Sequence, residues 1–420
     1  MLAKLLAPSY NSAMNTRTGL QRLVANNFAQ LNGAKTGVIS NHSAIDENGA
    51  HLVDLLVESK KCSIARLFSP EHGFRGDAQD MESVETYQDP KTGIEVVSLY
   101  GSNESSLVPS EKFLSDLDLV VFDIQDIGSR YYTYVNTLAY TMGVAAKTNT
   151  KVLVLDRPNP INGISIEGSP LEDRYKSFCG YAPIGNRHGL TSGELSVLFN
   201  KGLSLGQGNA SATACELEVV ELENWDRSSF FNETSLPWVL PSPNMPTLET
   251  ALVYPGGCLF EATNMSEARG TTRPFELIGA PYIVPEQWSE LSLELYTELS
   301  GEKPEGFFLR QTSFTPGFQK WAKKACHGVQ IHITDCSKPF SYRLCLAMIA
   351  AAAKLYPNDF AWRSDAYEFK TDISPIDILY GNPNFRLQLE KDPTDLKSIK
   401  QEIEGFEKDY SAVHEQFKIY

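Results

Sequence analysis

The chain has 420 residues, of which 42% are hydrophobic and 21% are charged, an ordinary balance for a globular protein. Its length favours two domains, because a single hydrophobic core rarely organises so many residues. The formal net charge of −15 argues against a nucleic-acid partner, since phosphate binding needs a basic surface. No stretch approaches the roughly 18 apolar residues of a membrane span, so we expect no membrane-spanning segment.

The cysteines predict a reducing compartment. There are seven, an odd number, and no two are spaced as CxxC, which is typical of free thiols rather than of disulfides or a zinc site. Residues 1–15 contain only a short apolar stretch before Pro8, a poor match to a secretory signal. We therefore expect a cytoplasmic protein.

The first half of the chain alternates short β-branched stretches with amphipathic ones, as in a parallel sheet with crossover helices. The expected strands are Thr36–Ser40, Ser63–Phe68, Ile94–Leu99, Leu117–Phe122, Lys151–Leu155 and Glu216–Leu222. The expected helices are His51–Lys61, Ser110–Asp116, Tyr134–Lys147 and Thr191–Asn200. Thr191 and Glu194 have the spacing of a capping box at the start of the last of these helices.

A proline-rich segment predicts the boundary between the domains. Ser235–Thr247 contains four prolines and has no hydrophobic periodicity. Beyond it, Gly328–Thr334 has the pattern of a strand and Tyr342–Leu355 that of a helix. The sequence thus predicts an α/β fold with domains at residues 18–238 and 239–420.

Polar clusters follow most of the expected strands. In an open parallel sheet, ligands bind outside the carboxyl ends of the strands. Four of the five strands in the first half lead into stretches of acids, amides, histidine and arginine, namely 41–43, 69–76, 123–132 and 156–160. This concentration at one edge predicts a functional site rather than a purely structural protein.

Several kinds of chemistry lack their motifs. There is no GxGxxG after the first strand, no GxxxxGK[ST], no GxSxG and no HExxH, so we expect no nucleotide, cofactor or metal. Carboxylates, arginines and aromatic residues are abundant, and glycoside hydrolysis uses these groups. Two alternatives stay open: a metal-dependent hydrolase using His42, His72 and Asp123, and a non-catalytic sugar-binding protein.

Nine stretches between residues 37 and 381 together resemble the exo-β-N-acetylmuramidase family. They are GVISNHS, SPEHGFRG, FDIQDIGSRYYTY, VLDRPNP, RHGLTSGEL, SPNMP, YPGGCLFEATN, ARGTTRPFELIGAP and SPIDILYG. The resemblance implies a Rossmann-like N-terminal domain, a smaller C-terminal domain and an active cleft between them. It also implies a glycosidase that releases N-acetylmuramic acid from the non-reducing end of peptidoglycan fragments in cell-wall turnover. Ala262 and Ala268 stand where the resemblance leads us to expect glycine.

Glu71 is the first candidate for the general acid, which must be protonated near neutral pH. It could instead form a structural ion pair with an arginine. Asp123 and Asp126 are the next candidates for a catalytic carboxylate, and Glu261 and Glu267 compete for that role from the second domain. Retention or inversion at the anomeric carbon depends on the separation of the two carboxyl groups, which the sequence does not fix.

The substrate-binding candidates fall into two groups. Muramic acid carries a lactyl carboxylate, which a guanidinium binds through two parallel hydrogen bonds; we expect at least two of the arginines to form internal ion pairs instead. The arginine candidates are Arg75, Arg130, Arg157, Arg269 and Arg273. The candidates for contacts to the sugar are Asn41, His72, Tyr131, Asn159, His188, Asn244 and Asn264.

Overall fold

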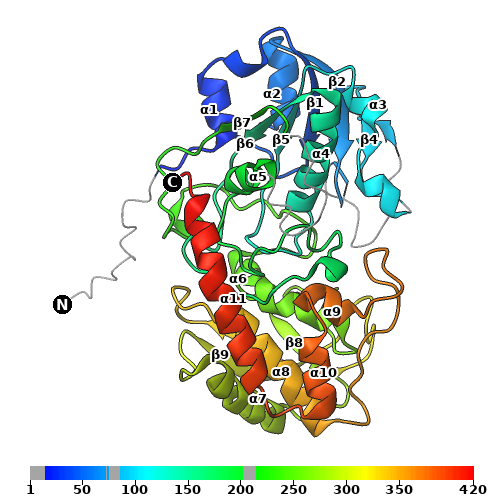
Figure 1. Cartoon of the computed structure of the whole chain (residues 1–420), viewed down its shortest axis with the longest axis vertical. Coiled ribbons are helices and arrows are strands. Elements are labelled where there is room, and N and C mark those ends of the chain that lie inside the picture. The colour runs from blue at the N-terminus through cyan, green and yellow to red at the C-terminus, as the bar shows by residue number, and fades with distance from the viewer. Residues whose placement is uncertain (1–14, 72, 75–85, 102, 202–213) are drawn as a thin grey trace, which may run out of the picture.

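The computed structural model describes residues 15–71, 73–74, 86–101, 103–201 and 214–420 as two lobes packed against each other (Figure 1). The first lobe contains a seven-stranded sheet and the second a three-stranded sheet with most of the later helices. No helix in these residues is long and apolar enough to cross a membrane.

The sheet of the first lobe has the order β3-β4-β2-β1-β5-β6-β7. Its strands are β1 (Lys35–Ser40), β2 (Ser63–Ser69), β3 (Tyr87–Gln88), β4 (Glu95–Ser98), β5 (Leu119–Asp123), β6 (Lys151–Leu155) and β7 (Leu217–Val220). All neighbours are parallel except β3, which pairs antiparallel with β4. Without β3 the order is 3-2-1-4-5-6, the Rossmann order, so the predicted fold class is confirmed.

Successive residues of these strands point to opposite faces of the sheet, and both faces are apolar. Helices therefore cover both faces. Leu67 of β2 packs in one core cluster and Phe68 in another, and Val121 and Phe122 of β5 divide in the same way. The first face is covered by α1 (Gly19–Ala25) and α2 (Leu52–Ser59), and the second by α3 (Glu111–Leu114) and α4 (Tyr134–Thr148).

The helix α5 (Ser192–Asn200) begins as the sequence predicts. The Thr191 hydroxyl accepts from the Glu194 backbone N–H at 3.2 Å, and the Glu194 carboxylate accepts from the Thr191 N–H at 2.9 Å. The predicted capping box is confirmed.

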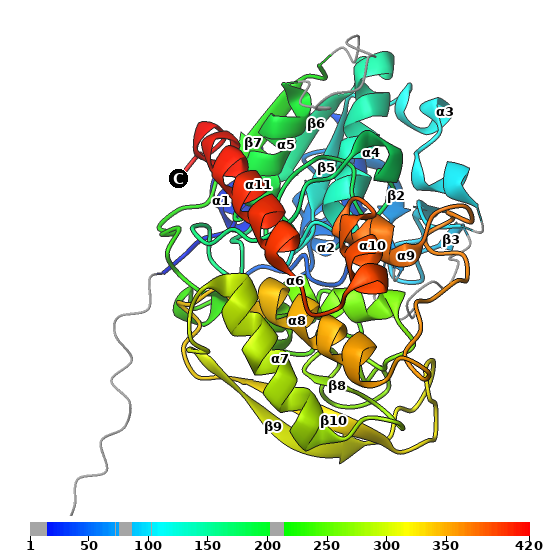
Figure 2. The same ribbon diagram turned by 60° about the horizontal axis from the view of Figure 1, so that its bottom comes forward.

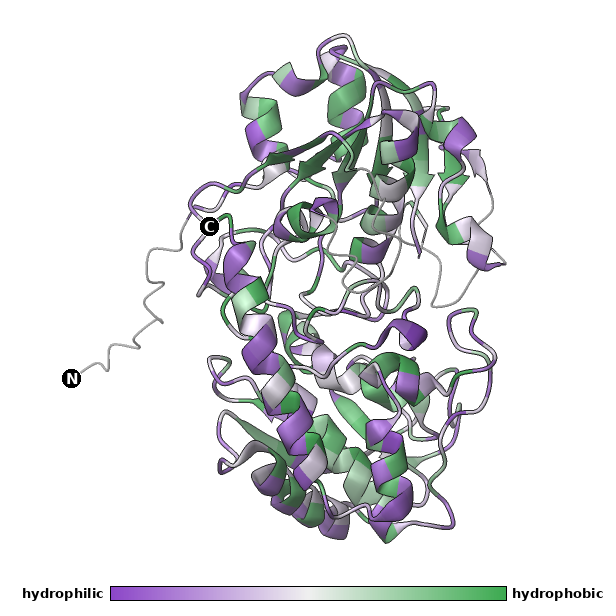
Figure 3. Cartoon of the chain, viewed as in Figure 1, coloured by the Kyte–Doolittle hydropathy of each residue, from purple (hydrophilic) through white to green (hydrophobic). Residues whose placement is uncertain are grey.

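The second lobe begins with α6 (Leu248–Gly257), after the proline-rich segment. It continues with β8 (Leu277–Ala280), α7 (Pro285–Ser300), β9 (Phe307–Phe314), β10 (Cys326–Ile333), α8 (Ser341–Leu355), α9 (Pro375–Tyr380), α10 (Asn384–Lys391) and α11 (Lys397–Gln416). The strands form an antiparallel sheet in the order β8-β10-β9. Figure 3 shows hydrophobic residues gathered on the strands, whereas the outer helices carry many hydrophilic residues. The division of the chain at residue 238 stays a prediction.

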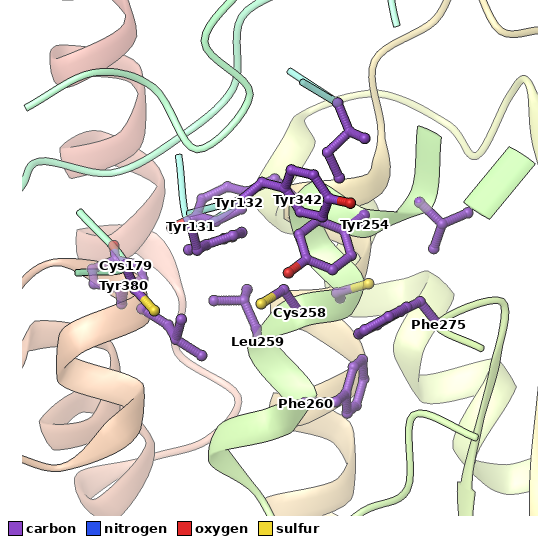
Figure 4. Packing of buried hydrophobic residues seen from close by; sticks show 14 of the residues in the cluster. Tyr131, Tyr132, Cys179, Tyr254, Cys258, Leu259, Phe260, Phe275, Tyr342 and Tyr380 are labelled. Atoms are coloured by element: carbon purple, nitrogen blue, oxygen red, sulfur yellow. The ribbon is translucent and has the colours of Figure 1, made fainter. Parts of the chain in front are cut away.

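The lobes are joined by one continuous core. A single cluster of buried apolar residues includes Ile39 and Phe122 of the first sheet together with Val329 and Leu346 of the second lobe. Figure 4 shows where Tyr131 and Tyr132 of the first lobe meet residues of the second.

The helix α11 lies across both lobes (Figures 1 and 2). Ile399 and Ile403 pack in the core of the second lobe, whereas Tyr410 and Phe417 pack against α5 and neighbouring residues of the first. The last residue, Tyr420, donates its hydroxyl to Asp156 Oδ2 at 2.8 Å, at the end of β6. The end of the chain therefore stabilises the N-terminal lobe, although the sequence assigns it to the second domain.

Asp156 predicts a pH-dependent stability. Burial raises its pKa from 3.8 to about 7, more than its hydrogen bonds from Thr191, Gly193 and Tyr420 lower it. The folded state thus binds the proton of the Asp156 carboxyl group more tightly than the unfolded state does. Protonation of Asp156 therefore stabilises the fold fully below about pH 4, and this contribution is lost as the pH rises towards 7. Relative to Asp156→Asn, the wild-type free energy of unfolding should fall by up to about 1.4 kcal/mol per pH unit in that window.

Urea unfolding of both proteins between pH 4.5 and 8 measures this difference. Asp226 is a matched control, because it is exposed and its pKa is lowered by Ser228, so Asp226→Asn should give a constant offset above pH 5. A constant offset for Asp156→Asn as well would contradict the raised pKa of Asp156.

Candidate active site

A buried cavity lies between the two lobes at the carboxyl ends of the first sheet's strands. We name it the inner cavity; its free volume is about 40 Å³, which is room for about three water molecules. It is lined by Glu71, Tyr131, Tyr132, Thr133, Tyr134, Cys179, Ser242, Asn244, Met245, Tyr254, Glu261, Arg269, Phe275, Tyr367 and Glu368. The cluster of Tyr131, Tyr132, Tyr254 and Phe275 appears in Figure 4.

Glu71 reaches this cavity from the turn after β2. The N–H of Gly73 donates to the Pro70 carbonyl at 3.2 Å, and Gly73 has φ +81°, a conformation that favours glycine. The Glu71 side chain is buried, and the Thr133 hydroxyl donates to its Oε2 at 2.6 Å. Burial, and to a lesser degree the charge of Glu71, raises the pKa of Tyr134 well above its usual range. A carboxyl group thus stands among buried tyrosines, as an acid catalyst requires.

Glu261 reaches the same cavity from the second lobe, in the 3₁₀ segment Cys258–Ala262. Its Oε1 accepts from Arg269 Nη2 at 2.6 Å, and its Oε2 accepts from the Tyr367 hydroxyl at 2.7 Å. Arg269 Nε lies 3.4 Å from Glu267 Oε1, and Lys320 Nζ lies 2.6 Å from Glu267 Oε2. Two donors, one of them a cation, stabilise Glu261 as a carboxylate.

Asn244 offers an unused donor to a ligand. Its side chain is 7% exposed, it lines the inner cavity, and its Nδ2 has no hydrogen-bond partner among the described residues. A buried donor without a partner costs about 1–3 kcal/mol, so its presence in a cavity is typical of a group that binds substrate.

Glu368 is a third carboxylate in the inner cavity that the sequence analysis missed. It is buried, and the Tyr100 hydroxyl lies 3.4 Å from its Oε2. Glu368 has φ +45° and Phe369 has φ +66°, as the two central residues of a tight hairpin turn closed by backbone hydrogen bonds between Tyr367 and Lys370 at 2.9 and 3.0 Å. Glu368 lies outside the nine stretches that the sequence analysis singles out. Tyr254 was also missed, although it belongs to a stretch, YPGGCLFEATN, that the sequence singles out.

Asp123 and Arg157 bind each other away from this cavity. Arg157 Nε lies 2.5 Å from Asp123 Oδ1, and Arg157 Nη2 lies 3.1 Å from Oδ2. Asp123 is fully buried at the end of β5. These two predicted site residues therefore form an internal ion pair with each other. The sequence analysis expects this alternative for at least two of the arginines.

Asp126 and His188 form a second buried pair. Asp126 Oδ2 accepts from the Gly128 N–H at 2.7 Å and lies 3.1 Å from His188 Nε2. His188 Nδ1 accepts from the Leu190 N–H, so the proton of the neutral ring is on Nε2. This pair shapes the turn before Arg130, and neither residue lines the inner cavity.

Arg130 also lies outside the cavity. Its side chain is buried and donates to four backbone carbonyls at 3.0–3.1 Å, those of Ser169, Ile184, Leu379 and Tyr380. Both terminal nitrogens of its guanidinium are thereby occupied, so it cannot form two parallel hydrogen bonds with a lactyl carboxylate, and the structure corrects that prediction: Arg130 connects the first lobe to the end of α9.

Three of the other asparagines predicted to contact the sugar donate instead to backbone carbonyl groups of the protein. Asn41 donates to the Pro241 carbonyl at 3.2 Å, Asn159 to the Leu190 carbonyl at 2.9 Å and Asn264 to the Asp359 carbonyl at 2.7 Å. Arg273 is partly exposed and lies 3.4 Å from both oxygens of Glu276. His72 and Arg75 lie outside the described residues.

The structure therefore brings five predicted residues together in the inner cavity: Glu71, Tyr131, Asn244, Glu261 and Arg269. As for the metal alternative, the described residues contain no group of three or more histidine, cysteine or acidic side chains that could hold a metal ion.

Comparisons with known proteins agree with this architecture. A crystal structure of a DUF1343 family protein from Bacteroides fragilis matches with a TM-score of 0.84 and 29% identity over 97% of this chain and 99% of that one. A second protein of that family and organism matches with a TM-score of 0.72 and 27% identity over 96% and 99% of the two chains. Both matches cover the two lobes together.

The sequence matches are more specific. The chain is 41% identical, over 96% of its length and 91% of the relative's, to the peptidoglycan β-N-acetylmuramidase NamZ of Bacillus subtilis. The family models of the N-terminal and C-terminal parts of exo-β-N-acetylmuramidase NamZ match residues 36–249 and 252–420. The resemblance found in the nine motifs is thereby confirmed, and the chain belongs to the exo-β-N-acetylmuramidase NamZ family.

Proposed function

We propose that this chain hydrolyses the β-glycosidic bond of N-acetylmuramic acid at the non-reducing end of peptidoglycan fragments. Family membership supports the glycosidase activity and the substrate class. The observation that carries the proposal for the site is the meeting of Glu71 and Glu261, from separate lobes, in one buried cavity. Two carboxyl groups flanking the scissile bond are the equipment of this reaction.

The surroundings of the two carboxyl groups suggest different roles. Glu71, buried among tyrosines and bonded to the Thr133 hydroxyl, protonates the glycosidic oxygen as the bond breaks. Glu261, bonded to Arg269 and Tyr367, stays ionised and stabilises the positive charge that develops at the anomeric carbon. Environments that separate two carboxyl groups in this way are the usual origin of an acid and a base in one site.

Substrate recognition uses groups that line the same cavity. Asn244 Nδ2 donates to an oxygen of the sugar or its acetamido group, and Tyr131, Tyr132 and Tyr254 provide apolar surface. Arg269 is the candidate for the lactyl carboxylate within the described residues, and Arg75 stays a candidate from the sequence.

The place of action is proposed as the cytoplasm. All seven cysteines lie in the described residues, and none forms a disulfide. Free thiols are the rule in reducing compartments. The net charge of −15 supports a small-molecule substrate rather than a nucleic acid as partner.

The decisive experiment is to incubate the protein with the disaccharide of N-acetylmuramic acid linked β-1,4 to N-acetylglucosamine. We expect release of both monosaccharides, detected by mass spectrometry, with the same rate after EDTA treatment. Binding without turnover would favour a sugar-binding protein, and a loss of rate on EDTA treatment, restored by zinc, would favour a metal-dependent hydrolase.

A further inference from the structure

The connection between β9 and β10 brings Lys320 to the segment that carries Glu261. The Lys320 ammonium donates to the Phe260 carbonyl at 2.7 Å and to the Thr263 carbonyl at 3.2 Å. Both carbonyls belong to the C-terminal end of the 3₁₀ segment that follows α6. The carbonyls at such an end lack partners within the helix, and a cation beside them is favourable. Lys320 therefore fixes the backbone on both sides of Glu261.

The same ammonium begins a chain of charges that ends at Glu261. Lys320 Nζ lies 2.6 Å from Glu267 Oε2, and Glu267 Oε1 lies 3.4 Å from Arg269 Nε. Arg269 Nη2 in turn donates to Glu261 Oε1 at 2.6 Å. The side chains of Glu261, Glu267 and Arg269 are at most 9% exposed. Two cations and two carboxylates give the chain no net charge, and loss of either end would leave a buried charge uncompensated.

A tight turn fixes the middle of this chain of charges. Ala268 lies between Glu267 and Arg269; its carbonyl accepts from the Thr271 N–H at 3.1 Å, and its own N–H donates to the Ser266 hydroxyl at 3.1 Å. Its φ is +60°, a conformation that favours glycine, which is the physical reason for the glycine expected at this position. The two charged side chains thus extend from a turn that backbone and side-chain hydrogen bonds hold in place.

A direct contact of Lys320 with the substrate is the alternative, because Lys320 lines a second cavity that shares Glu261 with the inner cavity. The free volume of this second cavity is about 510 Å³. An ammonium has three N–H donors, however, and three oxygen atoms of the protein lie within 3.2 Å of Nζ. The protein itself therefore occupies the donors of Lys320.

We propose that Lys320 is a positioning residue for the hydrolysis. It holds the backbone on both sides of Glu261 and, through Glu267 and Arg269, keeps the Glu261 carboxylate ionised. This inference rests on the proposed function, in which Glu261 stabilises the positive charge that develops at the anomeric carbon. Lys320 acts through Glu261 and touches neither the substrate nor the reacting atoms.

The pH dependence of kcat/KM measures this arrangement. The acid side of the profile follows the ionisation of Glu261, and the alkaline side follows the loss of the Glu71 proton. The other ionisable groups that line the two cavities are Cys179, Arg363, Asp365, Glu368 and the tyrosines. The variants described next leave all of these groups in place.

The test is a charge cycle in which kcat/KM for the disaccharide is measured against pH. Lys320→Met removes a cation, so the acid side should move by about one pH unit to higher pH, and kcat at the optimum should fall about 10- to 100-fold. Glu267→Gln removes an anion, so the acid side should move to lower pH. The double variant has no net change in charge and should return the acid side to its wild-type position.

Two further variants separate charge from geometry. Lys320→Arg keeps the cation but replaces the compact ammonium by a planar guanidinium, so the acid side should stay in place while kcat is lower. Lys323→Met changes an exposed lysine of the same connection; it is the matched control and should leave the profile unchanged. A thermal melt of each variant shows that the folded protein is measured.

The outcomes separate this inference from the proposed function. If the wild-type protein does not hydrolyse the disaccharide, the proposed function fails and the inference falls with it. If the wild-type protein is active but Lys320→Met lowers only the melting temperature and leaves the acid side in place, the proposed function stands and Lys320 is merely structural. Should Lys320→Met fail to fold, Glu267→Gln decides: an acid side that stays in place or moves to higher pH overturns the inference.

Discussion

Glu71→Gln is expected to lower the turnover of the disaccharide by about 10²–10⁴-fold with little change in the fold or in product binding. The amide is nearly the same size as the carboxyl group and can still accept from Thr133, but it has no proton to give at neutral pH. Steady-state rates, a thermal melt and binding of free N-acetylmuramic acid measure the three quantities. Glu294→Gln, an exposed position on α7, is the matched control and should behave as wild type.

The leaving group tests the role of Glu71 rather than its importance alone. A nitrophenyl glycoside needs less protonation of the departing oxygen, so Glu71→Gln should lose less rate on it than on the disaccharide. Equal losses on both substrates, together with a lower melting temperature, would make Glu71 a structural residue. The acid would then have to be sought at Glu261 or Glu368, the other carboxylates of the inner cavity.

The sequence predicts the sheet well because its signals are local. Alternating apolar residues and the capping box at Thr191 depend on neighbours a few positions away, and the structure confirms both. The antiparallel strands β8 and β9 were missed, since short strands in the second lobe lack a distinctive pattern. The return of α11 to the first lobe depends on contacts across some 200 residues, which no local pattern reveals.

The site was predicted only in part, for a related reason. Polar residues at strand ends indicate the correct edge of the sheet, but not the direction of each side chain. Asp123 and Arg157 turn towards each other, whereas Glu71 turns into the inner cavity. Glu368 reaches the cavity from a tight turn closed by Tyr367 and Lys370, and only the fold of the whole chain brings that turn beside the first lobe.

Arg130 shows why an arginine that the sequence offers for substrate binding can instead stabilise the fold. The sequence offers its guanidinium for the lactyl carboxylate, but in the structure it holds carbonyls of both lobes. A buried cation is tolerated there because its donors are satisfied; burial lowers its pKa, but from a value so high that the charge is retained at neutral pH.

Arg130→Met should therefore destabilise the protein by at least about 3 kcal/mol, because four buried carbonyls lose their donor and each costs about 1–3 kcal/mol. Arg130→Lys should recover part of this, since an ammonium has three donors but no planar fork. Urea unfolding measures the loss, and Arg174→Met, at an exposed position, is the control. In the fraction that remains folded, the preference for muramic acid over glucosamine glycosides should be unchanged. If Arg130→Met instead unfolds like the wild type and loses that preference, Arg130 binds the lactyl group as the sequence predicts, and its bonds to the carbonyls do not stabilise the fold.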